Sequence, residues 1–234
     1  MPPTCHTNTK NHLLSGLPQD IFDHLWPSLN RESWSIGETV YNVGDPIDHV
    51  YFVEEGVASI VTIMANGATS EVGMIGSRGM VGVPVLLGES TSAQHVIVQI
   101  PGTALRMDTP LCKAAFDRYP AFHTLVLRFI GAFLNLSAQT AACNRLHSAR
   151  QRCARWLLMA SDHIHSDTMP MTQEFLSSML GVRRTGVTAI AGDLQRSGLI
   201  QYHHGSITII DRHGLEAAAC ECYALDQGPF RRLL

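Results

Sequence analysis

The chain has 234 residues, of which 45% are hydrophobic and 16% charged, a composition that is ordinary for a folded protein with a sizeable core. The formal net charge of −3 excludes a protein that is basic overall, so a nucleic-acid function would need a local basic patch. Apolar runs such as Val57 to Met64 are too short to cross a bilayer, and the start of the chain lacks the pattern of a signal peptide. We therefore expect a cytoplasmic protein with no membrane partner.

Two residue types have an informative distribution. Six cysteines are scattered without a repeating framework, which predicts reduced thiols rather than a disulfide-stapled fold: Cys5, Cys112, Cys143, Cys153, Cys220 and Cys222. Beyond Lys113 no lysine occurs, and the second half of the chain is rich in arginine: Arg145, Arg150, Arg152, Arg155, Arg183, Arg184 and Arg196. These arginines form a candidate patch for nucleic acid, although a genome that favours arginine would also explain the missing lysines.

The first half of the chain predicts a sheet. A helical segment at Leu17 to Leu29 precedes short strand-like runs broken by turn residues, from Ser35 to Met107. Two strand-like runs flank Glu54-Glu55-Gly56, and Asn66-Gly67 supplies a second hairpin turn at which a positive φ costs little. Several short strands with regular turns predict an antiparallel sandwich or barrel.

Helices follow the predicted sheet. Thr109 is expected to cap a short helix that has Pro110 at its first position and stops before Pro120. A long helix then runs from Ala121 to about Arg145, with a stripe at helical spacing: Leu125, Phe129, Phe133, Leu136 and Thr140. This stripe is a candidate dimer seam, and packing of the same stripe on the chain's own barrel is an equally good interpretation.

The remaining segment predicts further helices and two strands. Ser148 is a candidate N-cap for a helix with core positions Ala154, Trp156, Leu157, Leu158 and Met159, and His165 to Pro170 is expected to be a loop. Thr172 caps the next helix, Gly181 ends it, and another helix runs from about Arg183 to Arg196. Two alternating strands then surround Gly205. We expect three parts: a barrel at residues 1–120, a dimerisation helix and hinge at 121–146, and a C-terminal domain at 147–234.

Two short helices with a tight turn, followed by a β-hairpin, predict a winged helix-turn-helix. Apolar positions set the crossing angle of the helices: Phe175, Leu176, Leu180, Val187, Ile190 and Leu194. This packing turns the opening of the second helix outward, where its side chains can enter the major groove of double-stranded DNA. The competing interpretation is that Arg183 and Arg184, at the opening of this helix, are only solvated surface charges.

Each candidate DNA-binding residue has an expected role. Arg184 is the choice for a base contact, because arginine bonds two acceptors of guanine at once, and Thr185 and Thr188 make shorter contacts to bases or phosphates. Arg183 contacts a phosphate. The helix end capped by Thr172 offers backbone amides to another phosphate, and His204 at the wing tip approaches the backbone or minor groove.

These residues carry a family resemblance. The run MTQEFLSSMLGVRRTGVTAIAGDLQRSGLI, followed by the wing at Gly205, resembles the DNA-binding domain of the Crp/Fnr transcription regulators, and IGETVYNVGDPIDHVYFVEEGVASIV resembles their cyclic-nucleotide-binding barrel. The helix from Ala121 to Arg145 is similar to the dimerisation helix of this family. The resemblance implies an α+β fold and a homodimer that binds a palindromic promoter site, with RNA polymerase as a further partner if the protein is an activator.

The sequence departs from the family at the ligand site. Nucleotide-binding members have a glutamate and an arginine that hold ribose and cyclic phosphate; here Val83 stands at the glutamate position, and no arginine occurs between Arg78 and Arg106. A cyclic phosphate would lose its strongest contact, so we expect no response to cyclic AMP. In the reading turn, Thr185 and Ala189 replace a glutamate and an arginine of the cyclic-AMP receptor protein, so the target sequence should differ.

No cofactor or metal is predicted from the sequence. Cys5 alone cannot supply the N-terminal cysteine cluster of the iron-sulfur members, and no spacing selects a pair of haem ligands among the histidines. His163-x-His165 and Cys220-x-Cys222 each make only half a metal site, and Cys143 and Cys153 near the hinge are candidate redox thiols. No small-molecule effector can be named. The alternative to a DNA-binding regulator is a ligand-binding module that acts through protein partners, and no catalytic constellation suggests an enzyme.

Overall fold

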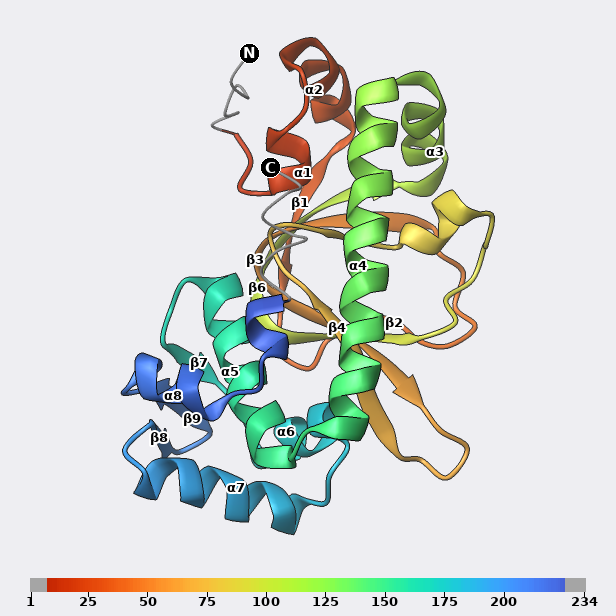
Figure 1. Ribbon diagram of the computed structural model, residues 1–234. Helices are drawn as coiled ribbons and strands as arrows, with labels where there is room; N and C mark the ends of the chain where they lie inside the picture. Colours follow the sequence, from red (N-terminus) through yellow and green to blue (C-terminus); the bar gives the residue numbers. More distant parts are fainter. Residues whose placement is uncertain (1–7, 226–234) are drawn as a thin grey trace. The chain divides into compact units, whose positions relative to one another are not determined.

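The computed structural model describes residues 8–225 (Figure 1). Within that range the chain forms two compact units. Unit 1 comprises the residues up to Ile60 together with Met74–Leu134, and unit 2 comprises Val61–Gly73 together with the chain from Asn135 onward. The division falls inside one long helix, α4 (Pro120–Leu146), and gives the tip of one β-hairpin to unit 2.

The N-terminal half is the antiparallel sheet that its turn spacing predicts. Short helices α1 (His12–Ser15), α2 (Gln19–Leu25) and η1 (Trp26–Ser28) precede it. Six strands follow: β1 (Asn30–Trp34), β2 (Thr39–Tyr41), β3 (His49–Ile63), β4 (Thr69–Ile75), β5 (Met80–Val81) and β6 (His95–Asp108). The order is β1-β6-β3-β4, and in addition β2 pairs with β6 and β5 with β3. Asn66-Gly67 forms the expected hairpin turn between β3 and β4, with φ of 80° at Gly67.

The turn predicted at Glu54-Glu55-Gly56 is wrong. Strand β3 continues through these residues, although Gly56 has a φ of 82°. A Cβ atom at Gly56 would lie 2.4 Å from the carbonyl oxygen of Ile100, and one at Gly102 would lie 2.0 Å from that of Glu55. The two glycines therefore permit a close approach of β3 and β6 inside the sheet. Gly56 serves this close contact between strands and does not form a turn.

The segment after the sheet also differs in detail from its prediction. A short 3₁₀ helix, η2 (Val83–Leu87), precedes β6, and helix α3 (Thr109–Arg118) follows it. The N-cap of α3 is Asp108 rather than Thr109. The Thr109 hydroxyl instead donates a hydrogen bond of 2.6 Å to the carbonyl oxygen of Ile47, so a tertiary contact takes the group that the local pattern assigns to capping.

Helix α4 buries one face and exposes another. Its buried side chains include Phe122, Val126, Phe129 and Leu136, whereas Leu127 is 47% exposed and Leu134 is 64% exposed. By length and composition alone α4 could cross a bilayer, but the buried core helices of many proteins meet the same criterion. Only 33% of the most apolar 18-residue stretch of α4 is buried, so the single chain leaves an apolar face of this helix uncovered.

Unit 2 is built from helices and a small sheet. Helix α5 (Ala149–Ile164) begins at a capping box in which Ser148 and Gln151 bond each other's backbone amides, as the cap prediction requires. Helices α6 (Gln173–Leu180) and α7 (Arg184–Arg196) and strands β8 (Ile200–His203) and β9 (Ser206–Ile209) also match their predicted segments closely.

Two elements of unit 2 are missing from the predictions. Residues Thr168–Pro170 form strand β7 rather than a loop, because their backbone pairs with β9 in the order β7-β9-β8. A last helix, α8 (Arg212–Ala218), follows the wing and is capped by Asp211, whose carboxylate accepts from the backbone amide of Gly214. The pairing of β7 depends on a strand that lies almost forty residues later, so its own sequence does not reveal it.

Candidate nucleic-acid interface

The turn between α6 and α7 adopts the tight geometry that its glycine predicts. Gly181 ends α6 in the left-handed conformation, with a φ of 62° and ψ of 34°, which a residue with a side chain rarely adopts. Arg183 is the N-cap of α7 in an extended conformation, so the helix begins at Arg184, one residue later than predicted. The two arginines thus occupy the cap and the first position of the helix.

The packing between α6 and α7 agrees in large part with the predicted set. Leu176, Leu180, Val187 and Leu194 are buried as expected. Phe175 and Ile190 are only half-buried, and Met179 and Ala191 take the inner positions instead. Burial of one face of each helix leaves the opposite side of the first turn of α7 facing solvent.

The exposed side of α7 carries the predicted reading residues. Arg183, Arg184, Thr185 and Thr188 are all exposed. In the part of the chain that the structure describes, neither guanidinium of Arg183 and Arg184 has a hydrogen-bond or ion-pair partner. Both cations are therefore available to an external anion without first giving up an internal contact.

Other arginines of the proposed patch are already engaged within unit 2. Arg150 pairs with Asp193 at 2.5 Å, and Arg196 lies 3.5 Å from the same carboxylate. Arg152 donates to the carbonyl oxygen of Leu180 at 2.9 Å, and Arg155 is buried and donates to Thr140. These contacts assign structural roles to these four arginines. Arg145, at the end of α4, is exposed and has no partner among the described residues, so Arg183 and Arg184 are the free arginines of the patch that lie in the helix-turn-helix.

Thr188 connects the two helices of the motif. Its hydroxyl lies 3.0 Å from the side-chain oxygen of Gln173 and 3.1 Å from the carbonyl oxygen of Arg184. The single proton serves one acceptor at a time, and the hydroxyl lone pairs remain free to accept from an external donor. Gln173 at the start of α6 is thereby a neighbour of the reading face that the sequence pattern alone does not identify.

The start of α6 has the cap that its sequence predicts. The hydroxyl oxygen of Thr172 accepts from the backbone amide of Phe175 at 3.1 Å. The threonine side chain is therefore used internally, and the backbone amides of the first turn are the groups that can meet a phosphate.

The wing ends in a two-residue turn. His204 and Gly205 both have positive φ, 47° and 78°, between β8 and β9. The rings of His203 and His204 are both exposed, with ring nitrogens 2.6 Å apart. His204 therefore lies at the wing tip, where the sequence places it.

The β3–β4 hairpin tip, which belongs to unit 2, contacts the helices of that unit. The indole nitrogen of Trp156 in α5 donates to the buried carboxylate of Glu71 at 3.0 Å. The Thr69 hydroxyl donates a weak bond of 3.4 Å to the carbonyl oxygen of Ser178 in α6. Residues of the sheet-forming segment thus help to hold the helices that carry the reading residues.

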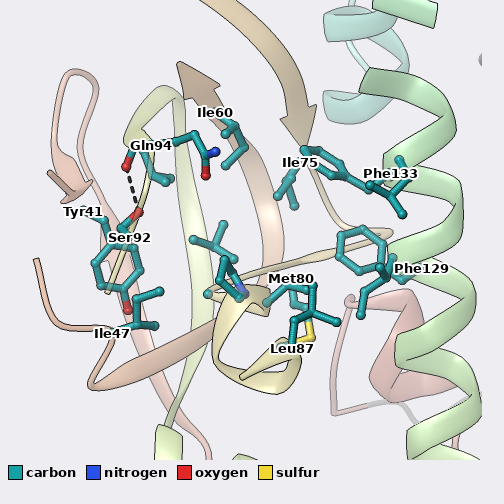
Figure 2. A pocket seen from close by; sticks show the side chains of 17 residues that line it. Tyr41, Ile47, Ile60, Ile75, Met80, Leu87, Ser92, Gln94, Phe129 and Phe133 are labelled. Carbon is teal, nitrogen blue, oxygen red and sulfur yellow. Dashed lines mark hydrogen bonds between the residues drawn. The ribbon is translucent and has the colours of Figure 1, made fainter. Parts of the chain in front are cut away.

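Unit 1 contains a cavity of about 270 Å³ between the sheet, η2 and α4, and Figure 2 shows its lining side chains. Most are apolar, including Ile60, Ile75, Met80, Phe129 and Phe133. Two of the polar groups are used internally: the Tyr41 hydroxyl donates to the His49 carbonyl oxygen, and the Ser92 hydroxyl to the backbone carbonyl oxygen of Gln94. Among the described lining residues there is no arginine, lysine, aspartate or glutamate.

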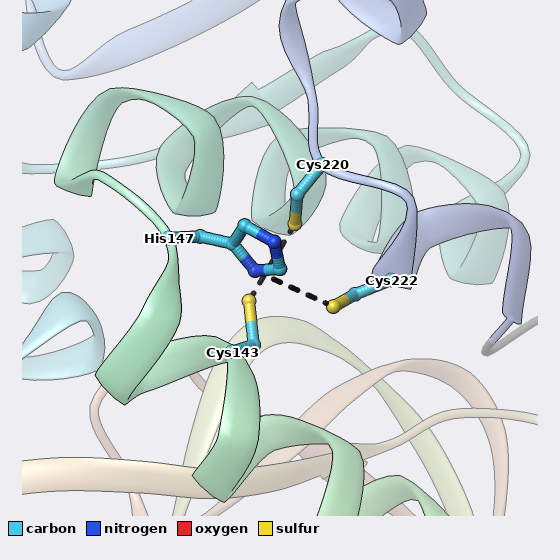
Figure 3. A group of neighbouring side chains, drawn as sticks. All are labelled: Cys143, His147, Cys220 and Cys222. Atoms are coloured by element: carbon cyan, nitrogen blue, oxygen red, sulfur yellow. Dashed lines mark hydrogen bonds between the residues drawn. The ribbon is translucent and has the colours of Figure 1, made fainter.

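Four metal-binding side chains gather in unit 2, as Figure 3 shows. Cys143 and His147 at the end of α4 meet Cys220 and Cys222, which follow α8. The sequence suggests Cys220-x-Cys222 only as half a site, and nothing in its spacing selects the other two donors. Cys153 does not join this group; its full burial raises its pKa to about 12, which suppresses the reactive thiolate.

Comparison with known proteins gives the same two parts in the same order. Residues 31–119 match the cyclic nucleotide-binding domain, and residues 151–218 match the Crp-like helix-turn-helix domain. The nitrogen fixation regulation protein FixK of Bradyrhizobium diazoefficiens is 27% identical over 211 residues, which cover 85% of this chain and 84% of FixK. A global nitrogen regulator of Nostoc is 23% identical over 191 residues, covering 76% of this chain and 84% of that protein.

Solved structures show the same fold. FixK2 from Bradyrhizobium japonicum superposes with a TM-score of 0.69 at 15% identity, covering 82% of this chain and 98% of that chain. A transcriptional regulator of the CRP family from Thermus thermophilus gives a TM-score of 0.67 at 21% identity, covering 80% and 96%. With both domains matched in order and a helix-turn-helix whose reading face is exposed, the chain belongs to the Crp/Fnr family of DNA-binding transcription regulators.

Proposed function

We propose that a homodimer of this chain reads a palindromic promoter site in the cytoplasm, without control by cyclic AMP. The observation that carries the reading site is a pair of exposed guanidinium groups at the start of α7 that have no partner among the described residues. Arg184 reads a base edge, because its planar guanidinium can donate to both major-groove acceptors of guanine. Arg183, one residue earlier at the cap, neutralises a phosphate.

The other proposed DNA contacts are based on the positions of hydroxyl groups on α7, of backbone amides at the start of α6 and of the wing tip. Thr185 and Thr188 reach bases or phosphates with hydroxyl groups that can donate and accept. The backbone amides behind the Thr172 cap face a second phosphate, and His204 approaches the DNA backbone or minor groove from the wing. A protein that activates transcription from such a site would also contact RNA polymerase.

The proposal of a homodimer is based on the uncovered apolar face of α4. Leu127, Gly131, Leu134 and Ala138 follow one another at intervals of four, three and four residues, the spacing of a coiled-coil seam. The two leucines are among the exposed large hydrophobic residues, and a Cβ atom added at Gly131 would meet nothing within 4 Å. A second copy of the helix could therefore pack closely on this face.

This seam differs from the stripe expected from the sequence. Phe129 and Leu136 are buried within the chain, and Leu125, Phe133 and Thr140 are half-buried. The burial of Phe129 and Leu136 supports the second interpretation of the stripe, in which these side chains pack within their own chain. We therefore place the dimer contact on the neighbouring stripe and keep α4 as the dimer helix.

Selection of bound fragments from random DNA is the test of the proposed function. The purified full chain should enrich an inverted repeat whose half-site centres lie about 34 Å apart, one helical turn, because a two-fold dimer presents two α7 helices. Selections under reducing and oxidising conditions guard against an inactive redox form. Enrichment of a single unrepeated site, or of no motif in either condition, would contradict the proposal.

Cyclic AMP should not bind to unit 1. The described lining of the cavity has no cation for the cyclic phosphate, and Val83 lies in η2 where the family resemblance implies a glutamate. Burying the phosphate there without a charged partner would cost more than the adenine contacts return. Calorimetric titration with cyclic AMP should give no heat of binding, and the selected DNA should bind equally well with and without the nucleotide. Micromolar binding would overturn this prediction.

The competing function is a ligand-binding module that acts through protein partners. On that interpretation the arginines of α7 have no DNA to contact, and their replacement leaves every activity unchanged. The free guanidinium groups and the exposed helix opening favour DNA.

A further inference from the structure

We propose that Cys143, His147, Cys220 and Cys222 bind one zinc ion as a closed, structural site. The four potential ligand atoms all lie within 4.8 Å of one another. Cys143 is in the last turn of α4 and His147 immediately follows that helix, while both other cysteines lie beyond α8 (Figure 3). The fold thus brings together donors that are 77 residues apart in the case of Cys143 and Cys220.

The distances fit a tetrahedral zinc ion. Zinc bonds of about 2.3 Å to sulfur and 2.0 Å to nitrogen place neighbouring ligand atoms about 3.8 Å apart for two sulfurs and about 3.6 Å for sulfur and nitrogen. The Sγ atoms of Cys143 and Cys220 are 3.5 Å apart, and Sγ of Cys222 is 3.6 Å from Nδ1 of His147. Four donors at this spacing complete a tetrahedron and leave no open position, which is the arrangement of structural zinc sites.

The surroundings orient the ligands. Nε2 of His147 lies 3.2 Å from the carboxylate of Glu221, so Nδ1 faces the sulfurs while the other nitrogen donates outward, as metal-bound histidines commonly do. The side-chain amide of Gln139 donates to Sγ of Cys222 at 2.9 Å. Three thiolates and Zn²⁺ together leave one net negative charge at the site.

Other uses of the cluster fit these positions less well. The three cysteines form a buried group composed only of one another, which is a poor apolar core but a good set of soft ligands. A disulfide between Cys143 and Cys220 would leave Cys222 and His147 without a role. An iron-sulfur cluster distributes its ligands over separate irons, which a group as tight as this one does not suit.

A zinc ion here would join the segment after α8 to the end of α4, within unit 2. The ion therefore ties the last part of the DNA-binding domain to the dimer helix that enters it. Since the ligands come together only in the folded chain, zinc binding contributes directly to the stability of unit 2.

The test begins with metal analysis of the full chain. Purified under reducing conditions, it should contain one zinc per chain by mass spectrometry. After removal of zinc by a chelator the melting temperature should fall, and Zn²⁺ should restore it. Co²⁺ in place of zinc should give the intense visible absorption of a tetrahedral thiolate site and a sulfur-to-cobalt charge-transfer band.

Matched variants separate the site from general effects on folding. Cys222→Ser and His147→Gln should each lose stoichiometric zinc, whereas Cys112→Ser, which removes a buried thiol outside the cluster, should keep one zinc per chain. Glu221→Gln leaves all four ligands in place and should weaken zinc about tenfold in competition with a chelator, the effect expected of a residue that orients a ligand. If a serine variant fails to fold, the Glu221→Gln and Co²⁺ measurements still decide.

Three results would overturn the proposal. They are a reduced chain that takes up neither Zn²⁺ nor Co²⁺, iron with acid-labile sulfide in place of zinc, and a Cys143–Cys220 disulfide in the native protein. None of these outcomes bears on DNA reading by α7, so failure here is distinct from failure of the proposed function.

Discussion

Replacing Arg184 with alanine is expected to lower affinity for the selected DNA site by about 1–3 kcal/mol for each half-site and to relax the preference at one base pair of each half-site. The side chain is exposed at the first position of α7 and has no partner in the described chain, so its removal should not disturb the fold. The measurement is binding of the chain to the selected site and to single-base variants of it, with melting temperature as a check on folding.

Two further variants give this experiment its controls. Arg183→Ala should weaken binding to all sequences similarly and reduce the slope of log affinity against log salt by about 1.8, because it removes one phosphate contact from each of the two half-sites. Arg118→Ala removes an exposed arginine from α3 and should change neither property. If Arg184→Ala binds the selected site and its variants as the unchanged chain does, Arg184 does not read a base.

Replacing Leu134 with glutamate is expected to convert the homodimer into a monomer. Leu134 is 64% exposed in the single chain, in the middle of the apolar stripe on α4, and a dimer would bury two glutamates facing each other there. Because each half-site alone is bound weakly, loss of the dimer should reduce affinity for the palindrome by about 100-fold or more. Analytical ultracentrifugation and DNA binding should show the two effects together.

The matched control is Leu111→Glu. Leu111 lies on α3 and is 47% exposed, the same fraction as Leu127 on the proposed seam. Leu127→Glu should weaken the dimer, and Leu111→Glu should leave it intact. A Leu134→Glu chain that remains dimeric would move the dimer contact away from this face of α4.

Much of the reading domain follows from the sequence, because its signals act over a few residues. Ser148 and Thr172 cap their helices through amides three positions along the chain, and Gly181 ends α6 through its own backbone freedom. Thr185 and Thr188 are exposed at the predicted positions for the same reason, since helical periodicity separates buried from exposed positions. The helix-turn-helix, its wing and its exposed arginines could thus be located from local pattern.

Features that depend on distant residues could not be located in this way. Gly56 has the backbone of a turn residue, yet β3 continues through it because β6 passes within van der Waals distance. The periodicity of α4 shows two neighbouring apolar stripes without showing which one the sheet covers. The sequence does not distinguish arginines with internal partners from free ones. Arg150 bonds Asp193 in α7 and Arg152 bonds Leu180 at the end of α6, and neither partner can be identified from the spacing along the chain.

The sequence by itself determined the order of the domains, the position of the helix proposed to read DNA, and the absence of arginine between Arg78 and Arg106, because each is a property of contiguous residues. The tertiary structure alone decided which arginines are free, which face of α4 is uncovered, and that Cys143 and His147 meet Cys220 and Cys222. These last properties depend on which distant residues are brought into contact, and a spacing along the chain contains no such distance.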